Sequence, residues 1–304
     1  MSSAVTSLRE TFSTPSARLG IAVMLFGILL FSLNDVMGKW LVATYSVGQV
    51  LLIRSAAALI ILIPFIWSAG AITLFRVERP KLQALRVAFS TAEVFCFYAA
   101  VVYLPLADVM TYWLAAPIYV AALSPFLLGE RVGWRRWTAI TIGFIGVLVA
   151  LQPSAATLTL PALISILGSL AFAFMMLSGR ALRGTPDTTL VFWQMVGAGV
   201  AGIVIAPFTW VQPTGFDLGL IALLGVVAMA AHVCVNRSLK LADAATVTPF
   251  QYTLLFWAVL FGWLVFGDVP RPAMLLGAAI IVAAGLFIFF RGRKVAKLEG
   301  RDPG

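Results

Sequence analysis

The sequence has few charged residues and few side chains of the kinds that build catalytic or metal sites. Only 11% of its 304 residues are charged, and it holds one histidine and two cysteines. A soluble domain carries roughly 25% charged residues, so this chain has too little polar surface to cover a soluble globule. Cys96 and Cys234 fall in apolar segments without metal-ligand spacing, and we interpret both as small core residues.

These absences argue against an enzyme. The sequence has no paired carboxylates at catalytic spacing inside its apolar segments, no glycine-rich phosphate loop and no metal-ligand cluster. Its net charge of +9 comes from basic residues spread over short loops, with no motif of a nucleic-acid-binding fold. We therefore predict no enzyme activity, no cofactor, no metal and no nucleic-acid partner.

Apolar residues are abundant, at 62% of the chain, and the mean hydropathy is +1.02. They form runs of the length that crosses a bilayer, for which about 20 helical residues suffice. Residues 1–18 are a Ser/Thr-rich tail with too few apolar residues for a signal peptide. The predicted spans are residues 19–41, 46–68, 82–102, 107–128, 134–151, 160–180, 189–209, 217–238, 244–266 and 272–290.

The chain contains an internal duplication. Residues 106–130 open on Leu-Ala-Asp and end on Gly-Glu, and residues 241–268 open on Leu-Ala-Asp and end on Gly-Asp. Two copies place five predicted helices in residues 19–151 and five in residues 152–290. Because five is odd, the second copy must enter the bilayer from the opposite face, which is the inverted repeat of many transporters. We predict an all-α membrane protein of ten helices around a central cavity.

The basic residues indicate the orientation. With the N-terminal tail in the cytoplasm, nearly all of the 21 Lys and Arg residues lie at cytoplasmic ends of the spans or in the basic tail of residues 291–304. Only Lys39 and Arg271 fall at the opposite face, and Arg54 lies inside the second span. Under the positive-inside rule, this asymmetry predicts both termini in the cytoplasm of a bacterial inner membrane.

Several motifs resemble the EamA-type branch of the drug/metabolite transporter superfamily. Each copy has a proline in its fourth helix, Pro117 or Pro249, then Gly-Glu or Gly-Asp, and a glycine-rich fifth helix. The second copy departs from the pattern, since Pro249 lies nearer the helix start and Asp268 replaces glutamate. The aromatic-rich interior resembles the YddG aromatic amino acid exporters. The resemblance, over residues 19–290, implies a ten-helix basket that exports amino acids and related compounds.

Ionisable residues within the spans are the first candidates for a substrate site, because charge is costly in a bilayer. Glu93 lies about 16 Å into the third span, near the midplane. We hypothesise that it binds a substrate ammonium group or takes up a proton. The alternative is a protonated carboxyl group hydrogen-bonded to a neighbouring helix.

Asp35, Lys39 and Arg54 are predicted gate residues. Asp35 and Lys39 have the spacing of an i, i+4 ion pair in the outer third of the first span. Arg54 lies about 12 Å in from the same face on the second span, so we expect the three to meet. The alternative is a local pair that offsets desolvation, with Lys39 extended toward the interface.

Further polar residues lie on the eighth and ninth spans. His232 is one turn from Asn236 and is interpreted as a proton relay or as a hydrogen-bonded packing residue. Gln251 and Tyr252 follow Thr248 by three and four residues and form a polar stripe, which either joins helices or lines a wet cavity.

Aromatic residues inside the spans are expected to surround an apolar substrate side chain or to fill the core. Those at span ends, among them Trp67 and Trp134, belong to the interfacial belt. The predicted cavity residues are Glu93, Tyr98, Tyr112, Trp113, Trp193, His232, Gln251 and Tyr252.

Four acids at the span ends have structural interpretations. Asp108 and Asp243 precede Thr111 and Thr246 by three residues and are predicted helix N-caps. Glu130 and Asp268 follow helices and are predicted to be structural.

The predicted function is alternating-access export of amino acids, aromatic and other neutral ones. The predicted partners are the small-molecule substrate and the lipid bilayer, and the chain is expected to be a monomer. The alternative substrate is a cationic drug or metabolite, for which an acid and aromatic side chains suffice. A non-transporting receptor is the third class. A nucleotide-sugar carrier is disfavoured, because we expect no Lys or Arg near the midplane.

Overall fold

The computed structural model describes residues 15–69, 74–75, 77, 79–128, 134–152, 159–182, 184–241 and 248–298. Within these ranges the chain is helical and contains no strand. Six helices are long and apolar enough to cross a membrane, and further apolar helices of 10–17 residues accompany them. The predicted all-α membrane class is confirmed.

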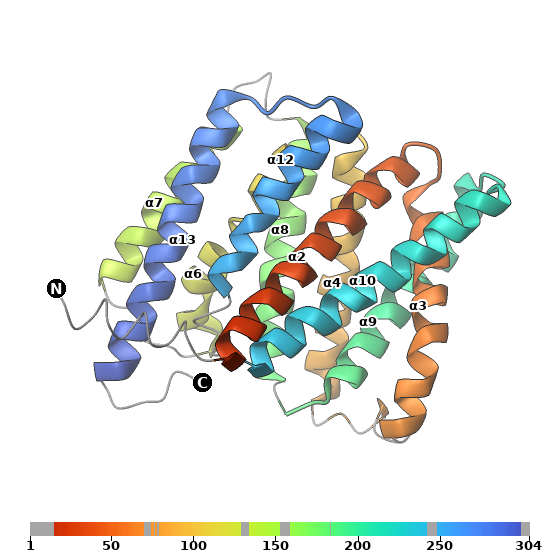
Figure 1. Cartoon of the computed structure of the whole chain (residues 1–304), viewed down its shortest axis with the longest axis horizontal. Helices are drawn as coiled ribbons and strands as arrows, with labels where there is room; N and C mark the ends of the chain where they lie inside the picture. Colours follow the sequence, from red (N-terminus) through yellow and green to blue (C-terminus); the bar gives the residue numbers. More distant parts are fainter. Residues whose placement is uncertain are drawn as a thin grey trace.

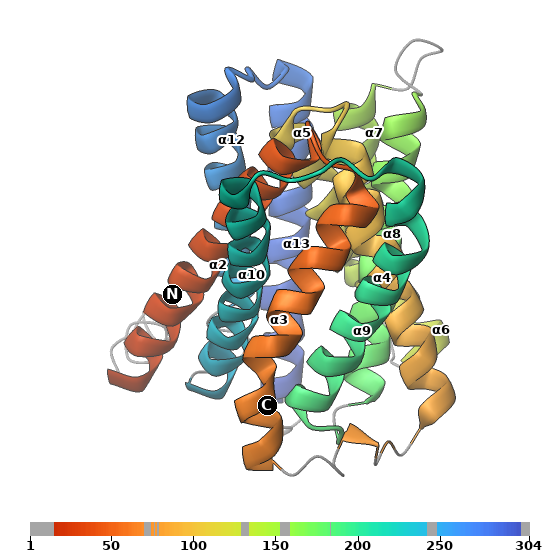
Figure 2. The same ribbon diagram turned by 90° about the vertical axis from the view of Figure 1, so that its right-hand side faces the viewer.

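The helices follow the predicted spans closely. Apart from α5 and α6, successive long helices run in opposite directions, so the last residues of α2, α4, α7, η2 and α12 lie at one end, drawn at the top in Figure 2. We call this the connection end. The elements are α2 (Pro15–Val42), α3 (Val47–Ala69), α4 (Pro80–Val101), α5 (Leu106–Trp113), α6 (Ala116–Leu128), α7 (Trp134–Leu151), α8 (Leu160–Ala181), α9 (Asp187–Ile205), η2 (Ala206–Thr209), α10 (Gly215–Leu241), η3 (Thr248–Tyr252), α12 (Thr253–Phe266) and α13 (Pro272–Leu298).

The fourth predicted helix is broken in two, contrary to the single helix expected over residues 107–128. α5 ends at Trp113 and α6 begins at Ala116. Pro117 has no amide hydrogen to donate to the Trp113 carbonyl, so the helical ladder is interrupted there. The span predicted over residues 244–266 is also not one α-helix, because its described part begins as the 3₁₀ turn η3 before α12.

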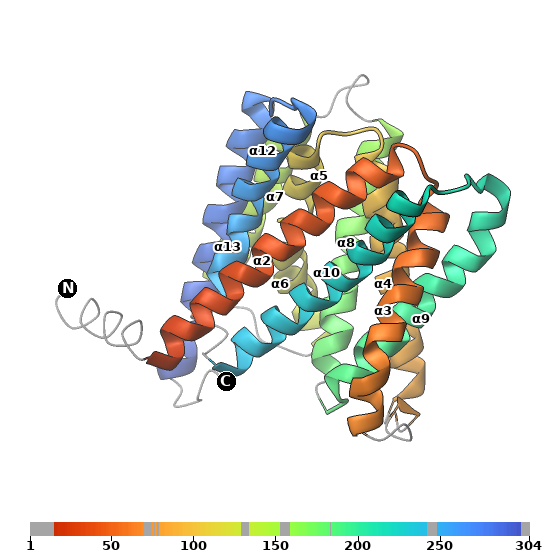
Figure 3. The same ribbon diagram turned by 45° about the vertical axis from the view of Figure 1, so that its right-hand side comes forward.

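The bundle is held together by helices of the two halves of the chain. α2 packs along α10 and α4 along α8, while α3 packs against α9 and α7 against α13. Figures 1 and 3 show α2 and α10 running side by side across the bundle, with α7 and α13 paired at its edge. Each of these pairs joins one helix from the first copy to one from the second. Neither half therefore buries its packing surface without the other.

Small residues permit one of these close approaches. A methyl group added at Gly202 of α9 would lie 2.6 Å from the Leu52 nitrogen and 2.8 Å from the Gly48 oxygen of α3. Both atoms belong to backbone, which cannot move aside without separating the helices. Membrane helices commonly use small residues at such crossings.

We expect Gly202→Ala to destabilise the protein by about 1–3 kcal/mol, the usual cost of overpacking. Thermal unfolding in detergent measures the change. Gly219→Ala is the matched control, because a methyl group there meets nothing within 4 Å. Equal melting temperatures for the two variants would contradict the close packing of α3 and α9.

The tryptophans predicted for the interfacial belt lie on the outside. Trp67 and Trp134 are exposed by 79% and 72%, and Trp137 and Trp210 are also exposed. Large exposed aromatic side chains at helix ends are typical of residues that contact the membrane interface.

Candidate functional site

Glu93 accepts a hydrogen bond from α5, the first part of the broken helix. The indole Nε1 of Trp113 on α5 donates a hydrogen bond to Glu93 Oε1 at 2.9 Å. Trp113 is itself buried and packs edge-to-face against Phe97, so the donor is held in place. This bond agrees with the interhelical hydrogen bond considered as the alternative for Glu93. It also fixes the direction in which the carboxyl group points.

Arg54 brings a positive charge to Glu93. Its side chain is buried, its Nη1 donates a hydrogen bond to the Tyr98 hydroxyl, and the guanidinium carbon lies 5.4 Å from the centre of the Tyr98 ring. Arg54, Asp35 and Glu93 interact electrostatically with one another. We call these three residues, from α3, α2 and α4, the charged centre. No basic residue is near Glu93 in the sequence, and helix packing supplies one, because α3 contacts α4.

The charges of this centre do not cancel. Two carboxyl groups share one guanidinium, so full ionisation leaves one negative charge inside the apolar bundle. An uncompensated buried charge is expensive, and a bilayer supplies no water to relieve it. The centre is therefore suited to hold one further positive charge, from a proton or from a ligand.

His232 lies within reach of the same centre. On α10, it interacts electrostatically with Arg54 and packs edge-to-face on Phe31 with ring centroids 4.8 Å apart. This contact fits the packing interpretation of His232. Its predicted neighbour Asn236 has a side chain outside the described ones.

The gate residue Lys39 has a different partner from the one predicted. Its Nζ lies 2.6 Å from Asp268 Oδ2, beyond the end of α12, and also over the Phe266 ring. The local pair of Lys39 with Asp35 is therefore wrong. Sequence spacing permitted that pair, but the packing of α12 on α2 offers Lys39 a closer acid while Asp35 interacts with Arg54 and Glu93.

Asp108 also makes an ion pair across helices. Arg271 Nη2 lies 3.3 Å from Asp108 Oδ2. The predicted N-cap role of Asp108 is wrong, because Pro105 is the N-cap residue of α5 and no side chain caps that end. Asp243 with Thr246, and Glu130, lie outside the described residues. The two bases predicted for the outer face, Lys39 and Arg271, thus both pair with acids at the connection end.

Two further contacts at this end were missed by sequence reasoning. The Tyr45 hydroxyl donates to Asp217 at 2.6 Å, and this bond raises the pKa of Tyr45 above its usual value. The Gln49 side chain bonds to both the carbonyl and the amide of Val211. The first contact joins the α2–α3 connection to α10, and the second joins α3 to the segment between η2 and α10. Their partners lie 172 and 162 positions apart in the sequence, so local spacing gave no signal for them.

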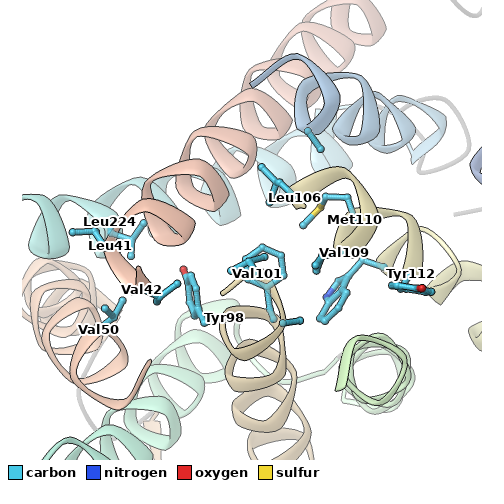
Figure 4. Packing of buried hydrophobic residues seen from close by; sticks show 14 of the residues in the cluster. Leu41, Val42, Val50, Tyr98, Val101, Leu106, Val109, Met110, Tyr112 and Leu224 are labelled. Carbon is cyan, nitrogen blue, oxygen red and sulfur yellow. The ribbon is translucent and has the colours of Figure 1, made fainter. Parts of the chain in front are cut away.

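A packed apolar layer closes the connection end. Buried residues from the last turns of α2 and α4 meet the first turns of α3 and α5, as Figure 4 shows around Tyr98 and Val101. The predicted cavity residues Tyr98, Tyr112 and Trp113 are part of this layer, each less than 9% exposed. In this conformation they pack against protein. Tyr98 and Trp113 contact the charged centre, whereas Tyr112 lies nearer to Asp108 and Arg271.

The remaining predicted cavity residues lie elsewhere. Trp193 on α9 donates to the Leu74 carbonyl and contacts Phe75, in the α3–α4 connection at the other end of the bundle. Tyr252 places its hydroxyl against Gly285 of α13, and Gln251 precedes it in η3, half-buried. The structure therefore gathers Glu93, Tyr98 and Trp113 with Asp35 and Arg54, and separates them from Trp193.

We expect the ion pairs at the connection end to keep the layer closed. In a variant without Cys96 and Cys234, a cysteine at Met110, which is 3% exposed, should label slowly with a membrane-impermeant thiol reagent. Lys39→Glu should increase the labelling rate several-fold, since it places like charges together. Adding Asp268→Lys restores opposite charges and should slow the labelling again. Unchanged labelling in Lys39→Glu would contradict this role.

These features define a class of protein: a multi-pass membrane protein with a buried, charged polar centre between apolar helices. No group of three potential metal ligands occurs among the described residues. The chain belongs to the EamA-like transporter family, whose sequence model matches residues 18–152 and 159–290. The predictions of this family and of a transporter in place of an enzyme are confirmed.

Several characterised relatives are similar over most of their length. The S-adenosylmethionine uptake transporter of Rickettsia felis is 26% identical, covering 90% of this chain and 94% of that protein. The riboflavin transporter of Rhizobium johnstonii is 29% identical, covering 90% and 91%. The pseudopaline exporter CntI of Pseudomonas aeruginosa is 25% identical, covering 87% and 94%.

The fold also matches that of a solved protein crystal structure. The TM-score is 0.64 at 16% identity, over 91% of this chain and 98% of that one. This likeness supports the helical architecture alone.

Proposed function

We propose that this chain is an alternating-access transporter that exports amino acids, aromatic and other neutral ones, across a bacterial inner membrane. The observation that carries the proposal is the charged centre, which combines a guanidinium with two carboxyl groups. An amino acid zwitterion carries the complementary pair of charges. Its carboxylate would bind Arg54, and its ammonium group would bind Glu93 and Asp35.

The architecture that we propose is ten spans in two inverted five-helix repeats, with both termini in the cytoplasm. The family model matches each half of the chain separately, which supports two repeats. The packing supports them as well, because exchanging the halves converts the α2–α10 pair into the α8–α4 pair and leaves α3–α9 and α7–α13 unchanged. Paired repeats of opposite orientation permit rocking around a shared midplane site.

Closure of the connection end supports loading from the cytoplasmic side. The apolar layer and its ion pairs lie between the charged centre and the connection end, so we expect substrate to enter from the opposite end. In the alternate state, the pairs Lys39–Asp268 and Arg271–Asp108 would separate, and the layer would open toward the outside. Asp35 on α2 and Arg54 on α3 belong to the charged centre, so they would couple opening of the layer to binding of substrate at that centre.

The second candidate substrate is an organic cation. The excess of one carboxyl group in the charged centre favours a ligand with a net positive charge. Aromatic rings beside the centre, Tyr98 and Trp113, suit both an aromatic amino acid and a flat cation. The relatives include both uptake and export proteins for other small molecules, so the substrate has to be established for this chain directly.

Flux measurements separate the two candidates. The purified protein is reconstituted in vesicles, and transport of labelled phenylalanine, threonine and methyl viologen is followed with and without a pH gradient. Transport of phenylalanine supports amino acid export. If only methyl viologen moves, the amino acid proposal is wrong. If none of the three moves and cysteines in the bundle do not change accessibility, the receptor class gains support.

A further inference from the structure

We propose that α4 carries a second binding site, built from Gln83 and Arg86, which takes the carboxylate of the substrate before it reaches the charged centre. The site lies toward the end opposite the connection end. It rests on the proposed function, because it would serve substrates that enter the bundle from the cytoplasmic side.

The spacing of polar residues on α4 defines a path. Gln83, Arg86, Ser90 and Glu93 recur at intervals of three and four residues, so they lie along one face of the helix. At 1.5 Å per residue, Gln83 is about 15 Å from Glu93 along the helix axis. This polar stripe leads from the start of α4, next to the α3–α4 connection, to the charged centre. An apolar helix face would serve packing better at every one of these positions.

Gln83 is the strongest sign of a ligand. The residue is 4% exposed, yet neither its amide nitrogen nor its amide oxygen has a hydrogen-bond partner among the residues that the structure describes. A buried amide with both groups unsatisfied is costly, and such cases in native proteins call for a water, an ion or a ligand. Thr91 Oγ1, on the side of α4 that faces α9, is also buried without a partner among the described residues. Gln83 therefore offers hydrogen-bonding groups to the stripe that the described residues do not satisfy.

Arg86 gives the proposed site a positive charge. Its Nη1 reaches the Leu190 carbonyl of α9 at 3.4 Å, and its Nε lies beside Gly179 of α8. Arg86 interacts electrostatically with His232 on α10, and the same histidine also interacts with Arg54. The Arg86 charge thus acts on the interior that the charged centre occupies.

An amide donor beside a guanidinium recognises a carboxylate. Arginine binds carboxylates through two parallel N–H groups, and the amide of Gln83 adds a third donor. A ligand without a carboxylate would gain nothing from Arg86. A substrate that arrives carboxylate first would then pass its carboxylate to Arg54 as its ammonium group reaches Glu93.

The test compares phenylalanine with two analogues in Gln83→Leu, which keeps the side-chain volume and removes the amide. We expect the KM for phenylalanine loaded from the cytoplasmic side to rise about tenfold with little change in kcat, and the KM for phenethylamine, which lacks the carboxylate, to stay the same. Binding of 3-phenylpropionate to the purified protein should weaken in Gln83→Leu and should be retained in Glu93→Gln. Gln83→Glu should weaken the binding of both phenylalanine and 3-phenylpropionate further.

The alternative outcomes are distinct. Equal KM changes for phenylalanine and phenethylamine, or no change for either, would overturn the second site. This conclusion would hold even if Gln83→Leu raised the melting temperature. If the wild type transports none of these compounds but binds 3-phenylpropionate in a manner that depends on Gln83, the proposed function fails and the carboxylate site stands. If it neither transports nor binds any of them, both proposals fail.

Discussion

Glu93→Gln is expected to lower the rate of substrate transport by about 10- to 100-fold. A hydrogen bond to a charged group contributes about 1.5–3 kcal/mol, and each 1.4 kcal/mol corresponds to a factor of ten in affinity. Glutamine preserves the side-chain shape, and its amide oxygen can still accept from Trp113 Nε1, so packing at the broken helix is retained. Initial rates and KM in reconstituted vesicles measure the effect.

Trp113→Phe is the matched control for Glu93→Gln. It removes the donor that orients the carboxyl group, while the aromatic ring and the charge of Glu93 remain. We expect a smaller loss of transport than in Glu93→Gln, since the charge that attracts the ammonium group is still present. A Glu93→Gln protein that folds normally and transports at the wild-type rate would exclude Glu93 from substrate binding.

Arg54→Gln is expected to destabilise the protein by about 3–5 kcal/mol, the usual cost of removing one partner from a buried charge pair. Arg54 is 7% exposed, and its loss leaves Asp35 and Glu93 facing each other without a cation. The pairing predicts a rescue. Adding Asp35→Asn to Arg54→Gln removes one of the two opposed acids and should recover part of the lost stability. Thermal unfolding in detergent measures both changes.

Arg271→Gln provides the comparison for Arg54→Gln. Arg271 also pairs with an acid, Asp108, but its side chain is 45% exposed. The pair is partly buried, because Asp108 is 7% exposed, but water reaches its Arg271 side, so the melting temperature should fall less than in Arg54→Gln. Similar losses in Arg54→Gln and Arg271→Gln, with no rescue by Asp35→Asn, would show that Arg54 does not compensate the two acids.

Helix ends were predictable where they depend on local chemistry. The predicted span of residues 134–151 matches α7, and most other ends fall within a few residues, because apolar runs bounded by prolines and charges specify where a helix can start and stop. The break at Pro117 had a visible cause as well. The prediction of one continuous helix failed because a proline inside a membrane helix bends it or breaks it, depending on what surrounds the freed carbonyl groups.

Partners of charged residues were predicted less well. Spacing suggested that Lys39 would bond to Asp35 and that Asp108 would cap its own helix. Both residues instead contact the connection between α12 and α13, in the other half of the chain. Local spacing shows which pairs are geometrically allowed, but an ion pair forms with whichever acid the packed helices bring closest.

The sequence alone determined that this chain is a helical membrane transporter of the EamA-like family, and it predicted Glu93 as an acid inside the third span. Composition, the length of the apolar runs and the duplicated motifs carry that information, since each is a property of neighbouring residues or of repeated ones. Only the tertiary structure decided that Asp35, Arg54 and Glu93 form one centre, that its aromatic neighbours close the connection end, and that Gln83 is buried without a partner. Those facts depend on which helices pack together, and the energy of a charge or an amide in a bilayer is set by the side chains around it in space.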